Sequence, residues 1–232
     1  MVGPGIVEVQ MLKQLMKKFR LIECTVVEPS GEQITSYKNL VEEQKDALNG
    51  VTFDWRQETI QEFCKANADG SKKFHFVSAI HSCYFIAKQD LDFYLNTLCE
   101  WTKGKILIML GAETGCFNRL EKKFFGSTHP SKMLPRENSI RESFQSLGVS
   151  YETKVIPGEC DITSCFESDS RVGKLLLDFL LQRVGCRDDG PPELLKVIKE
   201  FLKTEGISHI RNGRIYAAVP THVIVASTSY GA

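Results

Sequence analysis

Two glycines and one acidic residue near the N-terminus have types and spacing that suit binding of a nucleoside. Gly3-Pro4-Gly5 stands immediately before an amphipathic segment, and Glu28 follows 23 residues after Gly5. Glycine permits a tight turn and a close approach of the backbone to a ligand. A carboxylate about 20 residues further on can accept hydrogen bonds from both hydroxyls of a ribose. Order and spacing therefore favour a nucleotide or adenosyl cofactor, although two glycines near a chain end are also typical of a flexible terminus.

The segments around these residues alternate between helical and strand patterns. Residues 6–19 place apolar side chains on one helical face, and residues 24–28 form a short β-branched run typical of a buried strand. Ser30 is a suitable N-cap for the helix that we expect to follow. Further strands are expected at residues 51–55, 74–80, 105–110 and 151–156, and further helices at residues 58–66, 91–101, 117–125, 135–147, 173–184 and 191–203. This alternation predicts βαβ units and a Rossmann-like α/β fold with a mostly parallel sheet.

Two short apolar segments close the chain. Residues 213–217 and 222–227 lie on either side of Pro220. We expect them to form an antiparallel hairpin at the edge of the sheet, which would make the sheet mixed. The chain has no internal repeat and no low-complexity segment, so we expect one domain spanning residues 1–232.

The overall charge excludes some classes of partner. The chain has 29 lysine and arginine residues against 29 aspartate and glutamate residues, and its pI is near 6.9. Neither sign predominates enough to hold a polyanion, which argues against a broad nucleic-acid or anionic-membrane surface. A small or weakly charged substrate is the better expectation.

Cysteine usage and hydropathy indicate a cytoplasmic protein. The eight cysteines form no Cys-x-x-Cys pair, and no histidine lies near them at a zinc-binding spacing, so we expect no metal site. The N-terminus lacks the long apolar run of a signal peptide, and no stretch approaches the roughly 18 to 20 apolar residues of a membrane helix. Reduced thiols and no membrane partner are therefore expected.

One block of sequence resembles a known family. Residues 26–34, VVEPSGEQI, resemble the corresponding stretch of the histamine N-methyltransferase family, whose members are class I methyltransferases dependent on S-adenosyl-L-methionine. The likeness covers essentially the whole chain by order and spacing, with further matches at residues 51–59, 80–85, 161–166, 176–180 and 191–194. The resemblance implies a Rossmann-like methyltransferase that acts on a small amine or imidazole.

The resemblance also implies a set of cofactor contacts. Glu28 would hold the ribose of S-adenosyl-L-methionine, Gln33 would steady the adjacent loop, and Ile80 would line the adenine or sulfonium side. Ile60 stands where the family has a serine contact, so that hydrogen bond would be lost. The full set of implied cofactor contacts is Gly3, Gly5, Glu28, Gln33, Thr59, Ile60 and Ile80.

An aromatic amine pocket is implied by the same resemblance. His81 stands where the family usually has a glutamine, and Tyr84 and Phe85 match a tyrosine pair with one hydroxyl lost. Phe117 and Phe179 would add aromatic walls, although core packing is the simpler interpretation of Phe179. Aromatic rings suit a flat imidazole and a sulfonium, because ring faces attract cations by about 0.5 to 2 kcal/mol. A strand-end polar residue without a pocket role is the alternative for His81.

Two polar substrate contacts of the family have no counterpart in this chain. The sequence starts within the glycine loop, so we expect the first strand and the N-terminal helix that carries an acidic contact to be missing. Ala218 and Val219 stand where the family has an asparagine. Losing such hydrogen bonds strongly alters specificity.

Several functions therefore stay open. The first is S-adenosylmethionine-dependent N-methylation of histamine, carnosine or another small imidazole or amine by a monomeric enzyme. The second is a truncated, catalytically inactive methyltransferase-like protein, and the third is a nicotinamide oxidoreductase, which lacks a hydride-site signature here. An imidazole nitrogen is largely neutral at pH 7, so the methyl transfer demands no dedicated base and we assign no catalytic acid or base.

Overall fold

The structure is a computed structural model that describes residues 5–68, 72–124, 136–181, 192–204 and 206–228. The chain divides into two compact units, each of which is described by itself. Unit 1 contains Met1–Ile108, Asn138–Tyr151 and Val225–Ala232, and unit 2 contains Met109–Glu137 and Glu152–Ile224. The expectation of a single domain stays a prediction.

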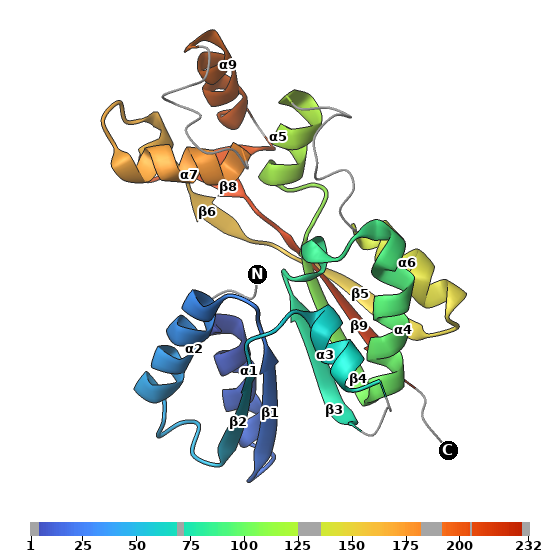
Figure 1. The fold of residues 1–232 in the computed structure, drawn as a ribbon. Helices are drawn as coiled ribbons and strands as arrows, with labels where there is room; N and C mark the ends of the chain where they lie inside the picture. The colour runs from blue at the N-terminus through green and yellow to red at the C-terminus, as the bar shows by residue number, and fades with distance from the viewer. Residues whose placement is uncertain (1–4, 69–71, 125–135, 182–191, 205, 229–232) are drawn as a thin grey trace. The chain divides into compact units, whose positions relative to one another are not determined.

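The N-terminal part of unit 1 is a helix–strand–helix–strand segment. It runs through α1 (Ile6–Met16), β1 (Ile22–Val27), α2 (Gly31–Glu43) and β2 (Val51–Arg56). β1 and β2 form a two-stranded parallel sheet in which Ile22 pairs with Val51 and Val27 with Arg56 (Figure 1). Buried side chains from both helices, from β1 and from the turn before β2 pack together in one cluster: Val9, Leu12, Val26, Tyr37 and Leu48.

A four-stranded sheet follows, with the strand order β3-β4-β9-β5. Its strands are β3 (Phe74–Ile80), β4 (Thr102–Gly111), β5 (Ser150–Ile156) and β9 (Thr221–Ser227). The neighbouring helices are α3 (Ile60–Ala66), α4 (Leu91–Trp101) and α6 (Glu137–Ser146), with short 3₁₀ turns η1 (Cys83–Phe85) and η2 (Lys88–Asp90) before α4. Ile106 and Ile108 of β4 are fully buried, as expected for a central strand.

Unit 2 contains a three-stranded antiparallel sheet with the order β6-β8-β7. Its strands are β6 (Glu159–Asp161), β7 (Ser208–Arg211) and β8 (Arg214–Ala218), and its helical segments are α5 (Cys116–Phe124), η5 (Thr163–Phe166), α7 (Arg171–Leu181) and α9 (Pro192–Leu202). Figure 1 shows α5, α7 and α9 grouped near β6 and β8. They share one apolar core, to which Leu120, Leu177, Leu202 and Ala217 contribute.

The expected α/β fold with a mostly parallel sheet is confirmed, and so is antiparallel pairing near the C-terminus. The partners of the last two strands differ from the expectation. β8 pairs with β6 and β7, whereas β9 lies between β4 and β5, so these two strands do not form a hairpin with each other and β9 is not at an edge. A long-range contact accompanies this arrangement: Pro220 lies between β8 and β9, and its carbonyl accepts at 2.8 Å the N–H of Ala112, which follows β4.

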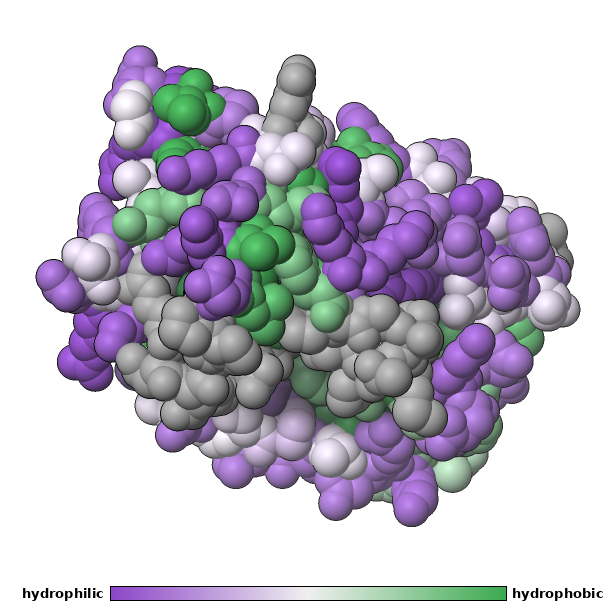
Figure 2. All heavy atoms as spheres, turned by 90° about the horizontal axis from the view of Figure 1, so that it is seen from above, coloured by the Kyte–Doolittle hydropathy of each residue, from purple (hydrophilic) through white to green (hydrophobic). Residues whose placement is uncertain are grey.

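The surface is mixed in character. Figure 2 shows a face on which hydrophilic residues predominate and hydrophobic residues gather in small groups. Within the described part of the chain, no helix is both long and apolar enough to span a bilayer.

Candidate functional site

Gly5 forms the turn that begins α1. Its φ of +76° lies in the left-handed region, and its carbonyl accepts the Val9 N–H at 2.8 Å as the first bond of the helix. A Cβ added at Gly5 would lie 2.2 Å from Cδ2 of Tyr37. Both the backbone angle and the lack of space therefore require glycine here. Gly3, the other expected glycine contact, lies outside the described residues.

Glu28 lies directly after β1 and is held in a tight turn. Its side chain is only 4% exposed, its Oε1 accepts the Ser30 N–H at 2.8 Å, and its own N–H donates to the Arg56 carbonyl at 3.0 Å. Ser30 then caps α2, because its Oγ accepts the Gln33 N–H at 3.4 Å. The Glu-Pro-Ser sequence thus ends the strand, fixes the carboxylate and starts the next helix. Gln33 lies in the first turn of that helix.

Thr59 and Ile60 begin α3 after β2. Thr59 Oγ1 accepts the Glu62 N–H at 3.2 Å, and the Glu62 carboxylate accepts the Thr59 N–H at 2.8 Å, which together form a capping box. These bonds from Thr59 lower the pKa of Glu62. The Thr59 hydroxyl donates to Glu62 as well, so its role in this structure is to start the helix. Ile60 is half-buried beside Phe63 and Trp101.

Ile80, His81 and Tyr84 lie at the end of β3 and in the turn that follows. Ile80 is the last strand residue and is 5% exposed. His81 has a φ of +51°, a conformation that residues with a Cβ rarely adopt outside constrained sites. Its ring stacks on Tyr84 with centroids 6.3 Å apart, and partial desolvation of the ring lowers the pKa of His81, although the residue as a whole is exposed. The neutral imidazole is therefore favoured. Phe85 is 58% exposed.

Phe117 and Phe179 meet in unit 2. Their rings make an edge contact with centroids 5.1 Å apart and an interplanar angle of 85°. Phe117 lies in the first turn of α5, and Phe179 on α7 is 59% exposed. The exposure of Phe179 argues against simple core packing. His81 and Tyr84 belong to unit 1, so their meeting with this aromatic pair stays a prediction.

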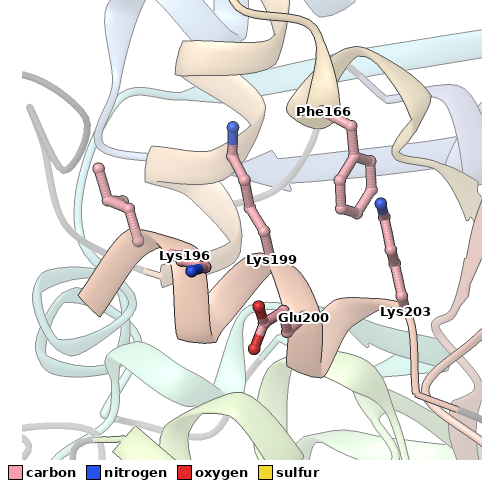
Figure 3. A pocket seen from close by; sticks show the side chains of 6 residues that line it. Phe166, Lys196, Lys199, Glu200 and Lys203 are labelled. Atoms are coloured by element: carbon pink, nitrogen blue, oxygen red, sulfur yellow. The ribbon is translucent and has the colours of Figure 1, made fainter. Parts of the chain in front are cut away.

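A surface groove on α9 does not coincide with any expected site residue. It has a volume of about 420 Å³ and is lined by Phe166, Leu195, Lys196, Lys199, Glu200 and Lys203. In Figure 3, Phe166 and Lys203 lie beside each other at one end of this groove, and the Lys203 ammonium is 4.8 Å from the ring centroid. No cluster of three or more potential metal ligands occurs among the residues that the structure describes.

The residues of unit 1 that were expected to bind the cofactor share one kind of position. Glu28 follows β1, Thr59 follows β2 and Ile80 ends β3, while Gly5 begins α1. In open α/β sheets the carboxyl ends of the strands are where ligands bind. Two contributors were not foreseen: Tyr37, which lies against Gly5, and Glu62, which completes the capping box. The Thr-x-x-Glu spacing is typical of a capping box and could have identified Glu62 from the sequence. Nothing in the sequence reveals which residue of α2 faces Gly5.

Comparison with known proteins gives the chain its family. No family model matches the chain. It is 31% identical to histamine N-methyltransferase A of Xenopus laevis and 30% identical to histamine N-methyltransferase of Mus musculus, and each match covers 92% of this chain and 74% of the relative. The chain belongs to the histamine N-methyltransferase family.

Solved structures give weaker matches. Magnesium protoporphyrin IX methyltransferase from Synechocystis PCC 6803 matches with a TM-score of 0.48 and 9% identity, over 96% of this chain and 82% of that one. A SAM-dependent methyltransferase from Archaeoglobus fulgidus matches with a TM-score of 0.46 and 13% identity, over 97% and 94%. Membership of the histamine N-methyltransferase family rests on the sequence relatives, and it agrees with the resemblance carried by the Val-Glu-Pro-Ser block.

Proposed function

We propose that this chain binds S-adenosyl-L-methionine through unit 1 and transfers its methyl group to a nitrogen of a small imidazole or amine, with histamine as the first candidate. The observation that carries the proposal is the pairing of a left-handed Gly5 at the N-terminus of α1 with a buried Glu28 after β1. The family supplies the chemistry, because its curated members are histamine N-methyltransferases.

The residues present fit the cofactor. The Gly5 turn leaves no room for a side chain on the Tyr37 side. It starts an 11-residue helix, and the first N–H groups of a helix have no hydrogen-bond partner within that helix. Glu28 is buried and its Oε1 accepts the Ser30 N–H, so its carboxylate has a fixed position from which it could accept ribose hydroxyls. When bound, the cofactor supplies an electrophilic methyl group on a sulfonium. Gln33, Thr59, Ile60 and Ile80 would shape the rest of this site, and Gly3 would extend the turn.

The amine side of the site would be built around His81. A neutral imidazole can accept one hydrogen bond and donate another, which suits an imidazole or amine substrate. Tyr84 would add a hydroxyl, and the exposed Phe85 ring would add an apolar wall. Phe117 and Phe179, whose rings contact each other in unit 2, remain proposed substrate contacts. The protein's contribution is alignment and exclusion of water, since a neutral ring nitrogen needs no general base.

Ala218 bears on which amine is methylated. It ends β8, where its backbone N–H donates to the Ile207 carbonyl at 2.9 Å. Its side chain is a methyl group and offers no hydrogen bond to a substrate. A site that lacks a polar anchor discriminates less sharply among imidazoles. Carnosine and other imidazoles are therefore the second candidates, and an inactive methyltransferase-like protein is the third.

A methyl-transfer assay with labelled cofactor tests the proposal. Histamine, carnosine, free imidazole and a primary amine without a ring would be offered at equal concentrations. Label transfer to at least one imidazole, at least tenfold above the ringless amine, would support the proposal. Cofactor binding without transfer to any of them would support the inactive alternative and overturn the enzymatic proposal.

Location and assembly belong to the same proposal. We propose a monomeric protein that acts in the cytoplasm on a small molecule, without nucleic acid or membrane as partner. No disulfide joins the seven cysteines within the described residues, which agrees with a reducing compartment. The equal numbers of acidic and basic residues agree with a small substrate rather than a polyanion.

A further inference from the structure

Gly5 and Tyr37 fit together so closely that neither tolerates a larger neighbour. An ideal Cβ on Gly5 would lie 2.2 Å from Cδ2 of Tyr37, 2.4 Å from Cε2 and 2.4 Å from Cγ. Real Cβ atoms do not approach other heavy atoms below about 3.0 Å. The Tyr37 ring therefore occupies the space that any side chain at position 5 would need.

The Tyr37 ring is itself held in a fixed position. It is 3% exposed and makes edge contacts to Trp55 at 5.2 Å and to Phe53 at 6.3 Å between ring centroids. Phe53 and Trp55 stack on each other with centroids 5.0 Å apart, and Lys38 Nζ lies 5.4 Å from the Trp55 ring. The ring at position 37 thus rests on two neighbouring rings of β2 and cannot yield easily.

The hydroxyl of Tyr37 contributes little to this arrangement. It is buried and has no hydrogen-bond partner among the described residues. Burial, with Cys24 and Glu8 nearby, raises the pKa of Tyr37, so the hydroxyl stays protonated. An unpaired buried polar group is a cost to the fold, which means that the ring and not the hydroxyl accounts for the fit at Gly5.

We propose that Tyr37 is the positioning residue of the cofactor turn: its ring presses on Gly5, holds that residue in the left-handed conformation and so fixes the N-terminus of α1. The cofactor part of this inference rests on the proposed function. Tyr37 touches no reacting atom and acts through Gly5. A turn that is fixed before the cofactor arrives spends less binding free energy on ordering the backbone.

The central test is a double-mutant cycle between positions 5 and 37. Gly5→Ala adds a Cβ that meets the Tyr37 ring, and Tyr37→Ala removes all three atoms that the Cβ would meet. Strain from the positive φ of residue 5 is common to both backgrounds and cancels in the cycle. We expect Gly5→Ala to weaken S-adenosylmethionine binding at least tenfold in the parent chain and less than threefold beside Tyr37→Ala. Equal effects in the two backgrounds would overturn the proposal.

Three control variants separate positioning from general damage to the fold. Gly148→Ala places a Cβ at a φ of +67° with nothing within 4 Å, so it reports backbone strain alone. Phe144→Leu disturbs a fully buried ring of α6 that does not belong to the cluster around Tyr37. Tyr37→Phe keeps the ring and removes only the unpaired hydroxyl. We expect Gly148→Ala and Phe144→Leu to leave the dissociation constant for S-adenosylmethionine within twofold of the parent value, and Tyr37→Phe, as the conservative variant, to rescue the binding that Tyr37→Ala loses.

Hydrogen exchange gives a readout that does not depend on the cofactor. The Val9 amide donates to the Gly5 carbonyl at 2.8 Å, so its protection reports whether the turn is formed. We expect Gly5→Ala to reduce Val9 protection at least tenfold, with Tyr37→Phe unchanged and Gly148→Ala unchanged at Val9. If Tyr37→Ala does not fold, Tyr37→Leu takes its place in the cycle, and an equal effect of Gly5→Ala on Val9 protection in both backgrounds would overturn the proposal. If Gly5→Ala lowers Val9 protection as expected but the parent chain binds no cofactor, the proposed function is contradicted and the packing inference stands.

Discussion

At the scale of single residues, the proposed site in unit 1 depends on groups whose position is fixed by short-range bonds. Glu28 is held by the Ser30 amide, and His81 is held in an unusual backbone conformation at the end of β3. The sequence revealed these residues through their order and spacing and through the Val-Glu-Pro-Ser block. It could not reveal Tyr37 behind Gly5, because that contact joins two helices and depends on how they pack.

Removing the charge of Glu28 tests its assignment to the ribose. Glu28→Gln keeps an oxygen that can accept the Ser30 N–H, so the turn and the fold should persist. A hydrogen bond to a charged group contributes about 1.5 to 3 kcal/mol, so S-adenosylmethionine affinity should fall about 10- to 100-fold. Calorimetric titration measures the change, and Glu32→Gln in the first turn of α2 is the matched control. Unchanged affinity in Glu28→Gln would remove Glu28 from the site.

Partial desolvation of the His81 ring predicts a dependence of stability on pH. The pKa of His81 in the folded chain lies below its ordinary value of 6.5, so the unfolded chain binds more protons as the pH falls. Stability should therefore be full above pH 6.5 and decrease as the pH falls through the lowered pKa. Thermal unfolding between pH 8 and pH 5 should show a smaller loss for His81→Gln than for the parent chain. The same profile in His81→Gln and in the parent chain would contradict the account.

At the scale of elements, most helices and strands follow from patterns within a few residues. The strand at β4, the helix at α1 and the cap at Ser30 were all readable from local apolar spacing and side-chain type. The hairpin of β7 and β8 was missed although its signal was present. Asn212 and Gly213 have φ values of +52° and +74°, which is the two-residue turn typical of Asn-Gly.

Strand partners were less predictable than strand positions. β9 was expected to pair with β8 and instead lies between β4 and β5. Contacts between residues far apart in the sequence accompany this choice: Pro220 accepts from Ala112, and His222 Nδ1 lies 2.7 Å from a carboxylate oxygen of Glu137 at the start of α6. The His222 side chain is 8% exposed and the Glu137 side chain 16%. Local patterns do not encode such pairs.

The capping box of α3 gives a prediction for an element. Thr59→Ala removes the acceptor for the Glu62 amide, so the free energy of unfolding should fall by about 1 kcal/mol. Thr59→Ser keeps the hydroxyl and should restore most of the loss. Urea denaturation measures both, and a Thr59→Ala variant as stable as the parent would show that the box does not stabilise α3.

At the scale of the whole molecule, the similarity to histamine N-methyltransferases covers 92% of this chain and runs through both compact units. The α/β class, the family and the cofactor could be predicted from the sequence. They depend on the alternation of strand and helix patterns and on the Val-Glu-Pro-Ser block. The joint role of His81, Phe117 and Phe179 as substrate contacts stays a prediction, since these residues belong to different units.

Assembly can be tested on the intact chain. We expect light scattering after size exclusion to give the monomer mass of 26.2 kDa at micromolar concentration, with and without the cofactor. The equal numbers of acidic and basic residues give no long-range attraction toward a charged partner. A stable mass of twice that value would contradict the proposed monomer.

The central claim is that unit 1 holds S-adenosyl-L-methionine between the Gly5 turn and Glu28. Calorimetric titration of the cofactor into the parent chain and into Glu28→Gln tests it most directly. The account predicts binding of one molecule per chain in the parent protein and a loss of at least tenfold in affinity in the variant. Absence of binding to a folded parent chain, or equal binding by both proteins, would contradict it.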